Sequence, residues 1–310
     1  MRRQNPNADH LRVLIVGVAL LLCAASAQAA ATPIPHGTLE FIAENQWIAP
    51  GHTLNLGLHF QLEKGWHVYW VNPGDSGEPP RLTWHLPPGI TVGPMEWPTP
   101  RRLGTATIAD FGYEDAVTLI VPIHAAATLP AKQPVQLTAD VKVLVCREMC
   151  IPGKAQISLT LPIKHQAAPS DTRTSNLFAA ARESLPQPAP GNWKFSLTDT
   201  KDSFVLSANI GRQITQAVFF PVAESQIDNA AQQKLAPKPA GFQLTLRKSD
   251  QLLNPIERLK GVLVLSADQS YAIDVPVSKP RAAQISEDVE IQLAQFASNR
   301  YRTLKEESQK

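Results

Sequence analysis

Two cysteines with three residues between them, Cys146 and Cys150, are the side chains best placed to do chemistry in this 310-residue sequence. A bent chain can bring their Cα atoms to about 6 Å, where a disulfide can close, whereas an extended strand would hold them roughly 13 Å apart. A disulfide in so tight and exposed a loop is of the reducible kind. The ring is also small, so it removes little entropy from the unfolded chain. The pair is therefore predicted to exchange electrons rather than to staple the fold.

Two other interpretations of the pair stay open. The first is an inert clip at the end of a hairpin. The second is copper binding, because Cys146, Met149 and Cys150 offer three soft sulfur ligands suited to Cu(I), although no Met-rich or His-rich tract accompanies them. Arg147 favours a thiolate electrostatically and Glu148 opposes it, so the sequence does not decide how reactive the thiols are.

The first 29 residues resemble a secretory signal peptide. Arg2 and Arg3 form a positive start, residues 13–25 are apolar, and small residues end the segment at Ala27-Gln28-Ala29. The third cysteine, Cys23, lies inside this leader, and no later segment is apolar enough to span a bilayer. The remaining chain is predicted to be exported to a compartment where disulfides persist.

Charge excludes one large class of partners. The chain has 29 basic and 27 acidic residues, and removing a leader that contains three arginines and one aspartate makes the two numbers equal. No basic stripe is present, so nucleic acid is not an expected partner. No metal site and no small-molecule cofactor is predicted.

The patterning of apolar residues is that of a mainly all-β protein. Segments in which apolar and polar residues alternate predict strands with one buried face. The clearest are residues 53–60, 135–143, 155–163 and 242–246, followed by the apolar runs 204–206, 217–220 and 262–265. Pro/Gly turns are expected at residues 72–75, 87–89 and 151–153, and the 27 prolines disfavour long helices. An antiparallel sandwich fits this pattern best.

The chain is predicted to divide into five parts. After the leader (1–29) come a first β domain (30–168), a helix and Pro-rich linker (169–190), a second, smaller β-rich domain (191–280) and a C-terminal helix with a charged tail (281–310). The helix before the linker is expected over residues 171–184, capped at 170–172, with Leu177, Phe178 and Ala181 on one face. The second domain contains no cysteine and no histidine, which predicts a structural or docking role.

Several motifs resemble the periplasmic N-terminal domain of DsbD-type thiol:disulfide interchange proteins, a family of protein-disulfide reductases. They are Gly65-Trp66-His67-Val68-Tyr69-Trp70-Val71-Asn72-Pro73-Gly74-Asp75-Ser76-Gly77, Asp110-Phe111-Gly112-Tyr113-Glu114 with Leu119-Ile120-Val121-Pro122, and the loop from Cys146 to Cys150 that leads into Ile151-Pro152-Gly153. The resemblance covers about residues 36–165 and is strongest to the suppressor-of-copper-sensitivity branch. Residues 193–276 resemble that branch's further periplasmic domain more loosely.

The resemblance implies an immunoglobulin-like sandwich and a periplasmic location. It also implies that Cys146 and Cys150 are a redox pair that takes electrons from a membrane-embedded thiol-disulfide reductase and passes them to oxidised periplasmic thioredoxin-like proteins. Asp110, Phe111 and Tyr113 match a short cap loop that shields the pair, in which Asp110 would tune thiol protonation.

Two departures from the family affect this interpretation. The cysteine spacing is shorter than in the best-known DsbD proteins, and the sequence contains neither the membrane-embedded nor the thioredoxin-like redox domain. The sequence therefore predicts a carrier that a separate membrane protein reduces, with a copper-tolerance protein or a non-catalytic adaptor as the alternatives.

Overall fold

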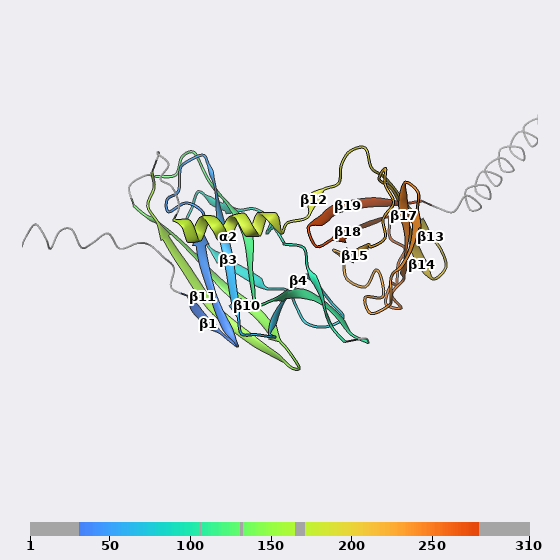
Figure 1. Ribbon diagram of the computed structural model, residues 1–310. Helices are drawn as coiled ribbons and strands as arrows, with labels where there is room; N and C mark the ends of the chain where they lie inside the picture. Colours follow the sequence, from blue (N-terminus) through green and yellow to red (C-terminus); the bar gives the residue numbers. More distant parts are fainter. Residues whose placement is uncertain (1–30, 106, 131–132, 165–170, 279–310) are drawn as a thin grey trace, which may run out of the picture.

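The computed structural model describes residues 31–105, 107–130, 133–164 and 171–278, which form two β modules (Figure 1). The predicted signal peptide and C-terminal helix lie outside these residues. The first module is an immunoglobulin-like sandwich, and every pairing between its named strands is antiparallel. This agrees with the fold class expected from the alternating pattern.

The first module consists of a five-stranded and a six-stranded sheet. The five-stranded sheet has the order β1 (Thr32–Ile34), β2 (Gly37–Ala43), β3 (Thr53–Leu62), β9 (Ala116–Ala125) and β6 (Ile90–Val92). The six-stranded sheet has the order β11 (Cys150–Leu161), β10 (Val135–Cys146), β4 (His67–Gly74), β8 (Ala109–Glu114) and β7 (Arg101–Gly104), with β5 (Arg81–His85) paired to β10. Buried and exposed residues alternate along β10, and the buried ones enter the core between the sheets.

The single described helix, α2 (Thr172–Glu183), begins and ends within two residues of its predicted limits. Asp171 caps it by accepting a hydrogen bond from the Thr174 backbone N–H at 2.9 Å. Phe178 and Ala181 pack against Ile42 and Ile120, so the helix covers the outer face of the five-stranded sheet (Figure 1).

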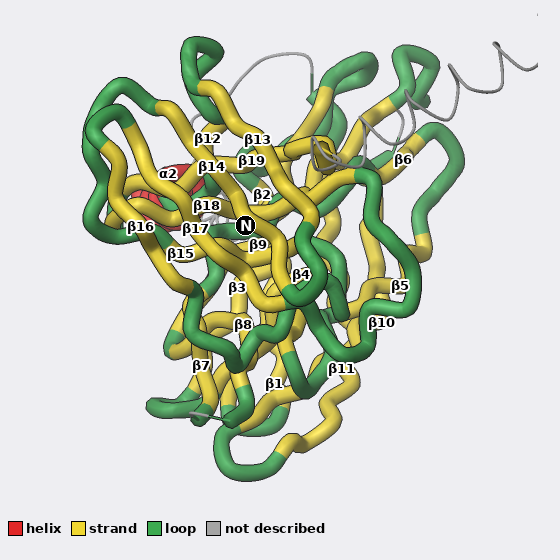
Figure 2. Tube along the Cα trace, turned by 90° about the vertical axis from the view of Figure 1, so that its right-hand side faces the viewer, coloured by secondary structure: helices red, strands yellow, loops and turns green. Residues whose placement is uncertain are grey.

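The second module is one eight-stranded sheet. Its order is β15 (Val218–Pro221), β18 (Arg258–Ser266), β19 (Gln269–Ser278), β13 (Lys194–Asp199), β14 (Ser203–Asn209), β17 (Gly241–Arg247) and β16 (Lys234–Lys238), with β12 (Gln187–Pro188) paired to β19. Figure 2, viewed from the side of this module, shows its strands in front of those of the first module. Most of its buried side chains form a separate core, but Phe220 and Val262 join the core of the first module.

Within the predicted linker, β12 pairs in parallel with β19 through Gln187 and Pro188. Two local expectations need correction. Asn72-Pro73-Gly74, expected in a turn, is instead the end of β4, where the register shifts between Tyr69 and Gly74. Pro152-Gly153 likewise lies inside β11, which is at the edge of its sheet. An edge strand tolerates proline because the missing N–H faces away from the ladder.

Candidate functional site

The two cysteines close the tip of the β10–β11 hairpin. Cys146 and Cys150 are the last partners in the ladder, with Cα atoms 4.1 Å apart, and they form a disulfide. The chain turns through Arg147, Glu148 and Met149, where the Arg147 backbone N–H donates to the Met149 carbonyl at 3.2 Å. The bent connection expected from the four-residue spacing is therefore present, and it is placed before Pro152-Gly153 rather than at it.

The two halves of the disulfide differ in exposure. Cys146 is 2% exposed, whereas Cys150 is exposed and its neighbour Met149 is 67% exposed. A macromolecule that approaches the hairpin tip therefore meets Cys150 before Cys146. This asymmetry is what a thiol–disulfide exchange site needs, because one sulfur must meet the partner while the other stays behind it.

The sheet register brings His67 beside the buried cysteine. His67 on β4 is the ladder partner of Cys146, and on its other side it is paired with Glu114 on β8. Cross-strand partners share a face of the sheet, with Cβ atoms about 5 Å apart. His67 is 7% exposed, and its Nε2 has no hydrogen-bond partner among the described residues. Burial lowers the pKa of His67, against opposing effects from Asp110 and Glu114, which favours a neutral imidazole at neutral pH.

Tyr69 contacts the exposed cysteine directly. Its hydroxyl lies 3.4 Å from Cys150 Sγ, and its ring meets the His67 ring edge-on with centroids 5.1 Å apart. The residue is fully buried. Burial raises the pKa of Tyr69 and outweighs the opposing hydrogen bond with Ser76, so the phenol keeps its proton. A protonated phenol in this position can donate a hydrogen bond to a Cys150 thiolate once the disulfide is reduced.

A short loop holds Tyr69 in place. Gly77 has φ of +81°, and a Cβ added there would overlap the Tyr69 ring, so this position has room only for glycine. Asp110 fixes the loop: its carboxylate accepts hydrogen bonds from the Ser76 backbone N–H at 3.0 Å and from the Ser76 hydroxyl at 2.9 Å. Asp110 is 6% exposed. The structure thus links Asp110 to the cysteines through Ser76, Gly77 and Tyr69.

Phe111 and Tyr113, the other expected cap residues, are buried on β8. Phe111 is 2% exposed and meets Phe220 of the second module edge-on, with ring centroids 5.0 Å apart. Tyr113 is 6% exposed and donates its hydroxyl to the Pro98 carbonyl at 2.7 Å. Burial raises the pKa of Tyr113 well above 10.0. These contacts are those of packed side chains, and a shielding role for either residue stays a prediction.

The turn between the cysteines rests on an aromatic stack. The Arg147 guanidinium lies 5.2 Å from the Trp66 ring centroid, and Trp66 also stacks on His36 with centroids 3.6 Å apart. Arg147 Nε donates to the Glu148 carboxylate at 2.9 Å, and this hydrogen bond lowers the pKa of Glu148. The charge of Arg147 is therefore shared between a carboxylate and an indole, both of which hold the turn.

His67 and Tyr69 are site residues that the sequence analysis missed. Both lie in the 65–77 motif, which was used there only for its resemblance to a family. A usable signal was present, since two polar aromatic side chains two residues apart in a strand share one face. What the sequence did not show is that this face carries the cysteines.

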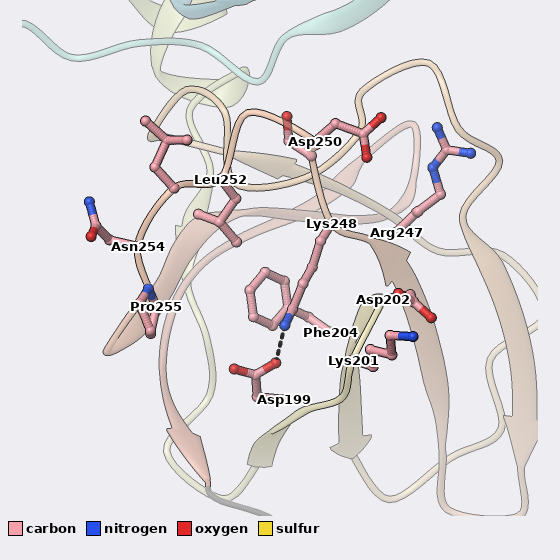
Figure 3. Close-up of a pocket in the computed structure, with 12 residues that line it drawn as sticks. Asp199, Lys201, Asp202, Phe204, Arg247, Lys248, Asp250, Leu252, Asn254 and Pro255 are labelled. Atoms are coloured by element: carbon pink, nitrogen blue, oxygen red, sulfur yellow. Dashed lines mark ion pairs between the residues drawn. The ribbon is translucent and has the colours of Figure 1, made fainter.

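The second module has a polar pocket of its own (Figure 3). Lys248 forms an ion pair with Asp199 there, donates to the Thr200 carbonyl at 2.7 Å and lies 5.0 Å from the Phe204 ring centroid. These contacts already neutralise the lysine. Because the module has neither cysteine nor histidine, this pocket offers no thiol or imidazole chemistry.

The described ranges contain neither a metal-binding cluster nor a membrane-spanning helix. In residues 31–105, 107–130, 133–164 and 171–278, no group of three or more His, Cys, Asp or Glu side chains is arranged to hold a metal. Within the same ranges, no helix has the length and apolarity needed to cross a membrane.

Comparisons with known proteins bear on the family and the fold of the first module. Residues 38–162 match the family model described as the N-terminal part of the thiol:disulfide interchange protein DsbD. The crystal structure of the N-terminal periplasmic domain of ScsB from Proteus mirabilis superposes with a TM-score of 0.63 and 18% identity, covering 83% of this chain and 100% of that one. At this identity the likeness shows a shared fold. The periplasmic chaperone SfaE gives a TM-score of only 0.22, with 11% identity over 77% of this chain and 100% of that one. No curated protein matches the chain.

Proposed function

We propose that this protein carries electrons in the periplasm through Cys146 and Cys150, since residues 38–162 match the N-terminal domain of the thiol:disulfide interchange protein DsbD. One observation carries the proposal: the disulfide lies at an exposed hairpin tip, with Cys150 exposed and Cys146 buried behind it. A structural disulfide does not require its two cysteines to differ in exposure. Thiol–disulfide exchange does require that a partner can reach one cysteine while the other remains available to resolve the mixed disulfide.

The proposed reaction has two steps. In the reduced protein, the Cys150 thiolate attacks a disulfide of the partner, forms a mixed disulfide and releases one partner thiolate. The Cys146 thiolate then attacks Cys150 Sγ, which closes the intramolecular disulfide and releases the second partner thiolate. The partner gains two electrons, and the protein loses two electrons together with the protons of its two thiols.

His67 and Tyr69 have distinct roles in this scheme. His67 faces Cys146 across the ladder as a buried imidazole, so it is placed to take the proton from the Cys146 thiol before the second step. Tyr69 is placed to donate a hydrogen bond to the Cys150 thiolate that begins the first step. Tyr69 contacts the Cys150 sulfur, and His67 is the ladder partner of Cys146.

The electron donor in this proposal is a membrane-embedded thiol-disulfide reductase, and the acceptors are oxidised thioredoxin-like proteins. The domain match supports this choice, because the matching model is that of a thiol:disulfide interchange protein. The periplasmic location is supported by the structural similarity to ScsB, because the matching part of ScsB is a periplasmic domain.

The reduction potential of the pair tests the proposal. The mature protein is equilibrated with glutathione buffers of known ratio, and its free thiols are counted by mass spectrometry after acid quenching. An exchange site is expected to titrate above about −300 mV, the range in which strained or exposed disulfides differ from structural ones. A pair that stays oxidised across that range would instead identify a structural clip. The same titration is repeated with Cu(I) present to test the copper alternative. If the reduced thiols bind Cu(I), the metal stabilises the reduced form and the pair stays reduced under more oxidising conditions.

A further inference from the structure

We propose that the second module positions the redox pair, and that Asn229 is the positioning residue through which it acts. The inference rests on the proposed function, because it assigns the second module an effect on the reactivity of Cys150. Asn229 is 6% exposed, and its Nδ2 donates to Asp75 Oδ1 of the first module at 2.9 Å. It is a partly buried hydrogen bond between a buried asparagine and an exposed aspartate that are 154 positions apart.

Asp75 is shared between the two modules. Its second carboxylate oxygen accepts the Ala109 backbone N–H at 2.8 Å, and its own backbone N–H donates to the Ala109 carbonyl at 3.0 Å. One carboxylate oxygen of Asp75 thus connects the start of the 75–77 loop to β8, and the other accepts the hydrogen bond from Asn229. A carboxylate held on both oxygens cannot swing away without breaking a charge-assisted bond.

The loop that Asp75 begins leads directly to the cysteine. Ser76 is held by Asp110, and Gly77 lies against the Tyr69 ring so closely that no Cβ would fit. The Tyr69 hydroxyl then contacts Cys150 Sγ at 3.4 Å. Every step from Asn229 to the sulfur is a covalent bond or a direct contact between neighbouring groups. Loss of the first contact therefore removes one of the hydrogen bonds that hold the loop, alongside those made with Ala109 and Asp110.

A second set of contacts joins the second module to β4, the strand that carries Tyr69. Asn72 on β4 is fully buried and donates its Nδ2 to the carbonyls of Pro221 at 2.8 Å and Ala223 at 3.3 Å. Phe220 packs edge-on against Trp70 with ring centroids 6.4 Å apart. The second module thus contacts β4 on either side of Val71, close to Tyr69, and lies beside that end of the first module in Figure 1. The second module therefore contacts the same strand that carries Tyr69.

The test is Asn229→Ala in the full mature protein, with Ser270→Ala as the matched control. Ser270 accepts a hydrogen bond from the Thr99 hydroxyl at 2.6 Å. Ser270→Ala therefore removes a different contact between the modules, one that does not involve the 75–77 loop. The readout is the rate at which iodoacetamide alkylates Cys150 in the reduced protein, followed by mass spectrometry as a function of pH. Because losing Tyr69 as a donor leaves less thiolate, Asn229→Ala should slow the reaction at pH 7 by about 2- to 10-fold, the effect of one hydrogen bond. Ser270→Ala should stay within about 2-fold of the wild type.

A double variant shows whether the effect passes through Tyr69. In a Tyr69→Phe background the donor is already absent, so Asn229→Ala should cause no further slowing. An undiminished effect in that background, or equal effects of Asn229→Ala and Ser270→Ala, would overturn the inference.

If Asn229→Ala does not fold, Asn229→Asp serves instead, since it keeps the shape of the side chain and sets a carboxylate against Asp75. Slowing at Cys150 supports the inference and an unchanged rate refutes it. The alkylation readout needs no protein partner. It therefore remains informative even if the glutathione titration rejects the electron-carrier function.

Discussion

The Tyr69 hydroxyl lies 3.4 Å from Cys150 Sγ, the exposed end of the disulfide. Tyr69 is itself fully buried, and burial raises its pKa, so the phenol approaches the sulfur as a neutral donor. Disulfide sulfur is a weak acceptor, whereas a thiolate is a strong one. The contact consequently favours the reduced, ionised state of Cys150 over the oxidised state.

We expect Tyr69→Phe to slow alkylation of reduced Cys150 at pH 7. Loss of one hydrogen bond to a charged group should reduce the rate by about 3- to 10-fold and move the rate–pH profile toward higher pH. Tyr113→Phe is the control, because the Tyr113 hydroxyl bonds to the Pro98 carbonyl in the segment between β6 and β7 and does not contact either cysteine sulfur. Its removal should cost about 1 kcal/mol of stability and leave the profile in place. Equal profiles for the two variants would remove Tyr69 from the site.

The two cysteine variants should behave differently toward the partner. Cys146→Ser removes the resolving thiol, so it should trap a mixed disulfide between Cys150 and the physiological partner. Cys150→Ser leaves only the buried Cys146, which is 2% exposed, and should trap nothing. Non-reducing gels of periplasmic extract, followed by mass spectrometry of the shifted band, check both. Trapping by Cys150→Ser alone would reverse the assignment, and trapping by neither would count against the electron-carrier function.

Phe111→Ala should destabilise the protein whether or not Phe111 also shields the cysteines. The ring is 2% exposed and packs against Phe220, so its removal leaves a cavity that costs about 3–5 kcal/mol. Urea denaturation measures this cost. Shielding is a separate prediction, measured under conditions in which the variant is still folded: if Phe111 caps the pair, alkylation of the reduced thiols speeds up. An unchanged rate would leave Phe111 as a packing residue only.

Reduction of the disulfide should leave the fold intact. The ring spans a turn of three residues, so its contribution through chain entropy is at most roughly 2 kcal/mol. The β10–β11 ladder continues for eleven further pairs, from Val145–Ile151 to Val135–Leu161, without help from the disulfide. Thermal unfolding before and after reduction should differ by only about 2–8 °C. Loss of the cooperative transition on reduction would favour the structural clip.

Stability should fall as the pH is lowered below about 6.5, because two histidines are buried. Burial lowers the pKa of both His59 and His67 below 6.5, so the unfolded chain takes up protons at a pH where the folded chain does not. Each histidine contributes a slope of at most about 1.4 kcal/mol per pH unit, which ends once the pH passes its folded-state pKa. Urea denaturation at several pH values between 7.5 and 5 measures the slope. The double variant His59→Gln/His67→Gln should flatten it, and an unchanged slope would contradict this explanation.

Much of the local structure could be predicted from the sequence. The alternating segments are strands, α2 lies within two residues of its predicted limits with the predicted cap at Asp171, and the cysteines lie in a bent connection between two neighbouring strands. These features depend on residues close together in the chain, where spacing and capping chemistry act directly. The resemblance to DsbD-type domains likewise depends on short motifs, and the family match at residues 38–162 confirms it.

Local patterns gave the wrong answer where the position of a strand within its sheet mattered. Pro152-Gly153 and Asn72-Pro73-Gly74 have turn composition, yet both lie in strands. Pro152 is tolerated because β11 is an edge strand, and residues 72–74 because β4 shifts register before Gly74. Edge position and register are properties of the assembled sheet.

The neighbours of the two cysteines were decided by tertiary structure. The ladder between β10 and β4 sets His67 opposite Cys146, and packing places Tyr69 on Cys150, 81 residues away in sequence. Asn229 reaches Asp75 only because the second module docks on β4. The sequence by itself singled out the two cysteines that we propose exchange electrons. Which groups surround them depended on strand pairing and module docking, because contacts over such separations arise only when the whole chain has folded.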